Sequence, residues 1–180
     1  MKTKDIIKFI WRITYSHVIA YFIAGIFALE VINYNDLFAT KELSLLMRPV
    51  SAPIVALGPF LQLFRGILLA LFLLPIRKVI IEGKYGFIKL GILILGLSLF
   101  LTIGPTSGSF DGYIYTIIPA MIQIAGYPEA ILYIILFVFM LWISYRYERK
   151  WINILLIIVV IIISALSIMG YFTLNDINGN

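Results

Sequence analysis

The chain alternates long apolar runs with short polar connections, and five of these runs are long enough to cross a membrane. A helix needs about 20 apolar residues to span ~30 Å of hydrocarbon. The expected spans cover roughly residues 9–32, 54–76, 87–103, 128–144 and 151–172. The pattern therefore predicts an all-α integral membrane protein with five transmembrane helices.

Two further segments have a helical pattern but are too short to span. Residues 113–126 are apolar and interrupted, so we expect an interfacial or re-entrant half-helix there. Residues 37–47 have helical spacing with Thr40 as a candidate N-cap, and we expect them to lie flat on the outer surface. No repeat or linker divides the sequence, which predicts a single transmembrane domain over residues 1–180.

Composition agrees with a membrane protein. The 180 residues are 62% hydrophobic and 13% charged, whereas about 25% of the residues of a soluble domain are charged. This excess of apolar surface needs the bilayer as its solvent. The first apolar run lacks a small-x-small cleavage site, so we expect a retained transmembrane helix rather than a secretory signal.

Basic residues predict the orientation. With the N-terminus in the cytoplasm, the inner side receives eleven of the 14 Lys and Arg residues, and the outer loops receive only Lys41 and Arg48. This distribution satisfies the positive-inside rule at every loop. Trp11, Trp142 and Trp151 fall at the same inner interface, where tryptophan prefers to lie. We therefore expect a cytoplasmic N-terminus, a C-terminus outside, and location in the plasma (inner) membrane.

The residue types present exclude several kinds of site. The sequence has no cysteine and a single histidine, His17, which excludes disulfides, thiolate metal sites and iron–sulfur clusters. We accordingly expect no metal and no cofactor. The net charge of +5 comes from residues that flank apolar runs, so we expect contacts with anionic lipids and no nucleic-acid partner.

Arg65 is the most informative polar residue, because the sequence places it inside the second expected span. A charge at that depth costs about 2.5 to 3.5 kcal/mol on insertion scales and usually faces a partner or water. Gln62, three residues earlier, lies on the same helix face. Both are candidates for binding an anion or carboxylate. The alternatives are an internal salt bridge and snorkelling of the arginine towards the outer head groups.

Three acidic residues fall in the outer half of the expected topology. Glu30 ends the first span, Glu129 begins the fourth, and Asp111 lies between the third and the fourth. Together with Arg65 they are candidates for one outward-facing polar pocket. The alternative is that Glu30 and Glu129 only mark helix ends in water, where an acid in a first turn also complements the helix dipole.

The first span carries the pattern of a helix contact. Ala20, Ala24 and Ala28 form a small-xxx-small ladder that lets another helix approach closely. His17 shares a face with this ladder, and we expect a hydrogen-bonded residue at a helix contact rather than a haem ligand or proton relay. Spacing favours internal packing of the ladder over docking of another protein.

The polar stretch GPTSGSFDGYIYTIIP, residues 104–119, lacks lysine and arginine, as the positive-inside rule predicts for an outer connection. A serine hydrolase site there would need His17 as its base, and the topology puts His17 near the opposite face. The stretch also lacks the spacing and the lysine of a phosphate-binding loop. We interpret it as a re-entrant or capping turn.

These features favour a small polytopic membrane protein that acts as a non-catalytic solute-binding or transport-associated component with an outward-facing pocket. The alternative is an accessory protein that packs against a larger membrane complex. An intramembrane enzyme acting on lipid-linked substrates has the least support, because no spacing supplies a paired acid and base. The chain is short for a complete transport pathway, so we expect membrane lipids and either a homo-oligomer or a partner membrane subunit as its partners.

Overall fold

The computed structural model describes residues 3–178, and these form helices, turns and irregular connections without a strand. The five longer helices are α1 (Thr3–Phe27), α4 (Gly58–Leu73), α5 (Gly86–Leu95), α8 (Tyr127–Arg146) and α9 (Lys150–Asn178). The short helices are α2 (Tyr34–Phe38), α3 (Pro53–Ala56), α6 (Phe110–Tyr115) and α7 (Ala120–Ala125). The 3-10 or π-helical turns are η1 (Ala28–Ile32), η2 (Leu74–Ile76), η3 (Lys78–Glu82) and η4 (Gly96–Phe100).

Four helical segments are long and apolar enough to cross a membrane. They are Thr3–Ile32, Gly58–Ile76, Ala120–Arg146 and Lys150–Ile177, and they correspond to four of the five expected spans. These helices are those of a multi-pass membrane protein. The expected third span, 87–103, is a shorter apolar helix over Gly86–Phe100, about 22 Å long at a rise of about 1.5 Å per residue.

The structure corrects the two expected interfacial helices. In place of one helix over 37–47, the helical residues are those of α2, and turns follow through residue 47. Asn33 adopts a left-handed φ of 59° and starts α2 with its side chain. The Thr40 hydroxyl donates to the Leu37 carbonyl, 2.8 Å away, so Thr40 lies after this helix rather than capping a new one.

The segment 113–126 also divides into two helices. α6 ends at Tyr115, and α7 begins after Pro119. Proline has no backbone N–H and disfavours helical geometry in the residue before it, which accounts for the break. Because Ala120–Arg146 is one long helical segment apart from a bend at Gly126, α7 extends the helix that contains α8.

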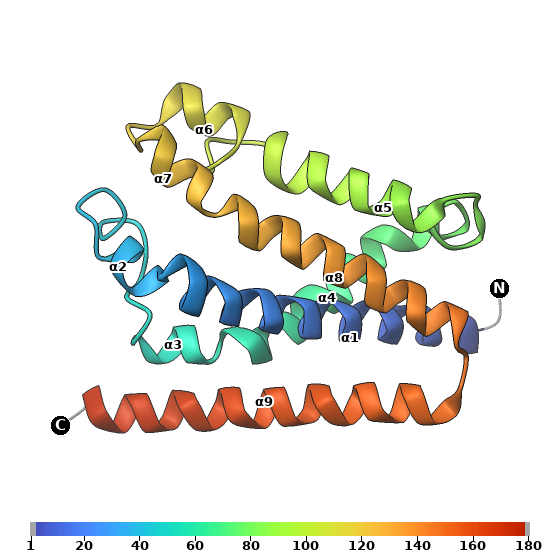
Figure 1. Cartoon of the computed structure of the whole chain (residues 1–180). Helices are drawn as coiled ribbons and strands as arrows, with labels where there is room; N and C mark the ends of the chain where they lie inside the picture. The colour runs from blue at the N-terminus through green and yellow to red at the C-terminus, as the bar shows by residue number, and fades with distance from the viewer. Residues whose placement is uncertain (1–2, 179–180) are drawn as a thin grey trace.

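Helix α1 forms the centre of the bundle. All residues from Arg12 to Ala20 are buried, as are Ala24 and Ala28. Helices α4 and α8 pack along α1, α9 contacts α3, α4 and α1, and α5 packs against α8 (Figure 1). Gly66 of α4 lies close to α1, since a Cβ atom there would be 3.0 Å from the Thr14 Cα. The alanine ladder therefore lies inside the bundle rather than on its surface.

The two ends of the bundle differ in the segments that they carry. The start of α1 lies at one end together with the turn between α8 and α9 (Figure 1). The opposite end carries α2, α6 and α7, and α9 finishes there (Figure 1). We refer to the first as the α8–α9 end and to the second as the α2–α6 end.

A charged cluster holds the α8–α9 end together. Glu148, in the turn between α8 and α9, accepts hydrogen bonds from Lys8 Nζ at 3.0 Å and from Arg12 at 2.9 Å. The Arg12 side chain is buried and its guanidinium lies 4.1 Å from the centre of the Tyr145 ring. The hydrogen bonds from Lys8 and Arg12 hold the pKa of the Glu148 carboxyl below its usual 4.5.

This cluster predicts an acid-labile contribution to stability. A carboxyl whose pKa is lower in the folded than in the unfolded protein stabilises the fold above its unfolded pKa, and the effect is lost as pH falls through the folded pKa. We expect the unfolding temperature in mild detergent to fall as pH drops below about 4.5, and we expect the Glu148→Gln variant to show a weaker dependence there. If the unfolding temperatures of wild type and Glu148→Gln depend on pH in the same way, the cluster does not contribute to stability through Glu148.

Candidate functional site

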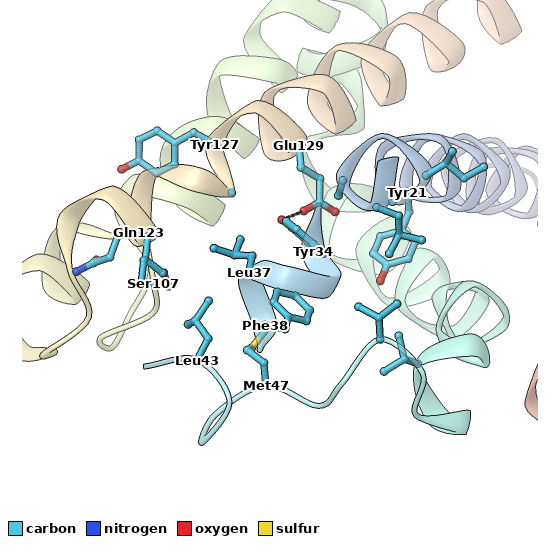
Figure 2. Close-up of a pocket in the computed structure, with 18 of the residues that line it drawn as sticks. Tyr21, Tyr34, Leu37, Phe38, Leu43, Met47, Ser107, Gln123, Tyr127 and Glu129 are labelled. Atoms are coloured by element: carbon cyan, nitrogen blue, oxygen red, sulfur yellow. Dashed lines mark hydrogen bonds between the residues drawn. The ribbon is translucent and has the colours of Figure 1, made fainter. Parts of the chain in front are cut away.

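A pocket lies at the α2–α6 end of the bundle, with a volume of about 500 Å³. Small-molecule sites usually have volumes of about 300 to 1,000 Å³. Most of the wall is apolar, and it is built by α1, η1, α2, the connection after α2 and the start of α8 (Figure 2). Its aromatic residues are Tyr21, Phe22, Tyr34, Phe38 and Tyr127, and its aliphatic residues include Ile26, Leu29, Leu37, Leu43 and Met47.

The polar feature of the wall is a pair between Tyr34 and Glu129. The Tyr34 hydroxyl donates a hydrogen bond to Glu129 Oε2 (Figure 2). Burial and this hydrogen bond raise the pKa of the Tyr34 phenol above its usual value of 10.0. The phenol is therefore protonated at neutral pH and remains a donor to the carboxyl group.

Local sequence brings these two side chains together. The left-handed Asn33 turns the chain at the end of η1, so that Tyr34 starts α2 across from α8. Pro128 lies in the first turn of α8, where its missing N–H costs no helical hydrogen bond. Glu129 follows in the same turn, as the sequence predicts. One side of the pocket is thus formed by the start of α2 and the start of α8.

The stretch 104–119 folds around the buried side chain of Gln123. The Gln123 amide accepts from the Gly108 N–H at 3.2 Å and donates to the Ile118 carbonyl at 2.8 Å. Gly108 has a φ of +84°, and a Cβ there would lie 2.8 Å from Tyr127 Cε1, so only glycine fits. The stretch borders the pocket through Ser107, and Gln123 also lines the pocket.

The five residues expected to form a pocket lie in different places. Glu129 lines the pocket, whereas Arg65, Gln62, Glu30 and Asp111 do not. Arg65 and Glu30 are exposed, and Arg65 makes no side-chain hydrogen bond or ion pair within residues 3–178. Asp111 is half-buried in the first turn of α6. Of the five expected residues, the pocket therefore contains Glu129.

Gln62 instead joins His17 at the contact of three helices. His17 is 1% exposed, and its Nδ1 lies 2.6 Å from the Tyr133 hydroxyl of α8. Its Nε2 lies 3.0 Å from Gln62 Oε1 of α4. A neutral ring satisfies both partners, because Nε2–H donates to Gln62 and Nδ1 accepts from Tyr133. His17 thus links α1 to α4 and α8.

A second hollow of about 560 Å³ lies between α5 and α8. Its wall contains only hydrophobic residues and Gly91, with Phe87 and Ile88 of α5 facing Ile135 and Phe139 of α8. It offers essentially no polar group that could fix the orientation of a ligand. The pocket beside Glu129 is therefore the better candidate site.

No group of three His, Asp or Glu residues within 3–178 lies close enough to hold a metal ion. The chemistry of the pocket is consequently that of one carboxyl group, two tyrosine hydroxyls near it and a largely apolar wall. Tyr21 is the second of these tyrosines, and its hydroxyl makes no side-chain hydrogen bond within the described residues.

Sequence reasoning missed Tyr21, Tyr34 and Phe38 as pocket residues. Aromatic side chains are common at membrane interfaces for reasons unrelated to ligands, so their presence near residue 33 carried no clear signal. The spacing of Tyr34 and Phe38, four residues apart on one face of α2, is visible in the sequence but predicts only a shared face.

Comparison with known proteins adds no relative to this description. No protein-family model, curated protein or solved structure matches the chain.

Proposed function

We propose that the chain crosses the plasma (inner) membrane five times, with its N-terminus in the cytoplasm and its C-terminus outside. Two observations support this orientation. Most Lys and Arg residues belong to the side of the N-terminus, and the two described ends of the chain lie at opposite ends of the bundle (Figure 1). The short α5–η4 helix is the fifth crossing, and the pocket beside Glu129 opens on the outer side.

We infer that this protein is a non-catalytic solute-binding component, associated with transport, whose site is the outer pocket. The observation that carries this function is the pocket of about 500 Å³ with a mainly apolar wall and one carboxyl group. Apolar walls supply affinity and a few placed polar groups supply orientation. The site residues are then Glu129, Tyr34 and Tyr21, in place of the Arg65 site expected from the sequence.

An accessory role in a larger membrane complex is the second candidate, because one observation favours it. Arg65 is exposed on a spanning helix, beside Phe64 at 58% and Leu68 at 55% exposure. An arginine among exposed apolar side chains fits a partner membrane subunit or a second copy that supplies an acceptor. Lipid head groups are another source of acceptors, which the Arg65 side chain reaches by extending along the helix towards the interface.

Catalysis on lipid-linked substrates has less support. Glu129 is the only acid that lines the pocket, and the histidine does not line it. His17 is occupied on both ring nitrogens by Tyr133 and Gln62. A paired histidine and carboxylate, a common acid–base arrangement, therefore has no support at the pocket.

Filling the pocket tests the binding function. Gly25 lines the pocket, and a Cβ built on it meets no atom within 4 Å. We expect native mass spectrometry of gently extracted wild-type protein to show a bound small molecule, and Gly25→Phe to lose it without a lower unfolding temperature. Gly96→Phe is the control, because Gly96 also has open space but lies outside the pocket.

Two results would contradict the binding function. One is wild-type protein that carries no small molecule, and the other is a ligand that remains equally bound in Gly25→Phe. A bound partner protein in place of a small molecule would instead favour the accessory role.

A further inference from the structure

We propose that the pocket takes a lipophilic organic cation, such as an ammonium group that carries apolar substituents. This inference rests on the proposed binding function and names the class of ligand for the same site. It is carried by three properties of the pocket, namely its charge, its aromatic residues and its apolar wall.

The wall carries one carboxyl group. Among the described side chains that line the pocket, Glu129 is the only ionisable acid or base apart from tyrosines. One carboxylate oxygen accepts from Tyr34. Within residues 3–178 the other oxygen, Oε1, accepts no hydrogen bond from a protein group. A cationic ligand offers a positive charge opposite this oxygen.

Aromatic rings surround the same volume. Tyr34 and Phe38 lie side by side in α2, with ring centroids 4.7 Å apart, and Tyr21 reaches the pocket from α1 (Figure 2). The face of an aromatic ring attracts a cation within about 6 Å, and aromatic cages are a recurrent way of binding substituted ammonium groups. An anion would meet the carboxyl group of Glu129 unfavourably.

The rest of the wall sets the size and polarity of the ligand. Aliphatic side chains line the rest of the pocket, with Leu37 beside Tyr34 and with Leu43 and Met47 below it in Figure 2. These groups cannot replace the water shell of a small inorganic cation. They favour a cation that has its own apolar surface, and the volume admits a molecule of drug size.

A pair of probes with the same shape and opposite charge tests the inference. Tetraphenylphosphonium is the cation and tetraphenylborate the anion, and binding is measured by equilibrium dialysis of the full chain in mild detergent. Gly25→Phe, whose pocket is filled, reports binding to the micelle and to other surfaces. Binding to the pocket is the part that wild-type protein shows and Gly25→Phe does not. We expect the affinity of the pocket for the cation to exceed its affinity for the anion by about tenfold or more, which is about 1.4 kcal/mol.

Glu129→Gln is the matched variant for the charge. Glutamine keeps an oxygen that accepts from Tyr34, so the variant retains the fold, and its unfolding temperature checks this. We expect Glu129→Gln to lower the affinity for the cation by about tenfold or more. The difference between the affinities for the cation and for the anion should decrease accordingly. Equal binding of the two probes to the wild-type pocket, or an unchanged affinity in Glu129→Gln, would overturn the cation inference.

These outcomes separate the two proposals. If a neutral or anionic molecule is bound in a way that Gly25→Phe abolishes, the pocket is a binding site and the cation class is incorrect. If no probe binds above the level of Gly25→Phe and native mass spectrometry shows no bound molecule, the binding function fails as well.

Discussion

Gly66→Leu is expected to destabilise the bundle by about 3 kcal/mol, near the upper end of the usual cost of overpacking. A Cβ at position 66 would lie 3.0 Å from the Thr14 Cα and 3.2 Å from its Cγ2. The first of these atoms belongs to the backbone of α1, so no side-chain rotation relieves the contact. The substitution must push α4 away from α1, at the contact where the centre of the bundle is buried.

Unfolding in mild detergent, followed by circular dichroism against denaturant, measures this effect. Gly25→Ala is the matched control, since Gly25 lies in the other helix of the pair and has no atom within 4 Å of a Cβ. We expect Gly25→Ala to leave stability unchanged or to raise it, because alanine favours helix. Equal stabilities of Gly66→Leu and wild type would refute the close packing of α4 on α1.

His17→Leu is expected to cost about 2 kcal/mol. Leucine keeps apolar bulk but removes the partners of Tyr133 and Gln62, which sit at 2.6 and 3.0 Å from the ring nitrogens. Interhelical hydrogen bonds in membranes contribute about 0.6 kcal/mol on average and up to about 1.7 kcal/mol. Buried groups left without a partner add a penalty of about 1 to 3 kcal/mol, reduced here because both partners are only half-buried.

A double-mutant cycle isolates this contact from general loss of packing. Tyr133→Phe removes one hydroxyl, and in the His17→Leu background it should cost less than in the wild type, because its partner is already absent. If the two residues were independent, the losses of unfolding free energy from the two substitutions would add within about 0.5 kcal/mol. Additivity of that kind would show that the hydrogen bond between α1 and α8 does not contribute to stability.

Both predictions concern the support of the pocket. Tyr21 lies one turn beyond His17 on α1, with the two rings 6.3 Å apart, and Glu129 lies one turn before Tyr133 on α8. The contact at His17 therefore fixes the relative position of the two helices that carry Tyr21 and Glu129. We expect His17→Leu to weaken ligand binding as well as stability, through the shape of the pocket.

The sequence could predict the spanning segments because that information is local. Each span is a long apolar run whose transfer into the bilayer depends on its own residues, so four of the five expected spans correspond to helices of spanning length. The placement of Pro128 and Glu129 in one first helical turn was predictable for the same reason. The fifth, Gly86–Phe100, ends in a π-helical turn before the glycines and prolines that follow.

The failure at Arg65 shows what periodicity leaves open. Gln62 and Arg65 are three residues apart, which suggests one face. Gly66, however, is the residue that touches α1, and Gln62 is four residues before it on the same side. Arg65 precedes Gly66 by one residue, about 100° around the helix, and is exposed. The buried face of α4 is the one that carries Gly66, Ala70 and Leu73, and the spacing of Gln62 and Arg65 does not predict it.

The membrane class, the helical spans and the charge bias are thus determined by the sequence alone, because transfer energies and the positive-inside rule act segment by segment. The pocket was decided by tertiary structure. Tyr21, Tyr34 and Glu129 are brought together by the turn at Asn33 and by the packing of α8 on α1. Such contacts depend on the directions of helices far apart in the sequence, and no local pattern encodes those directions.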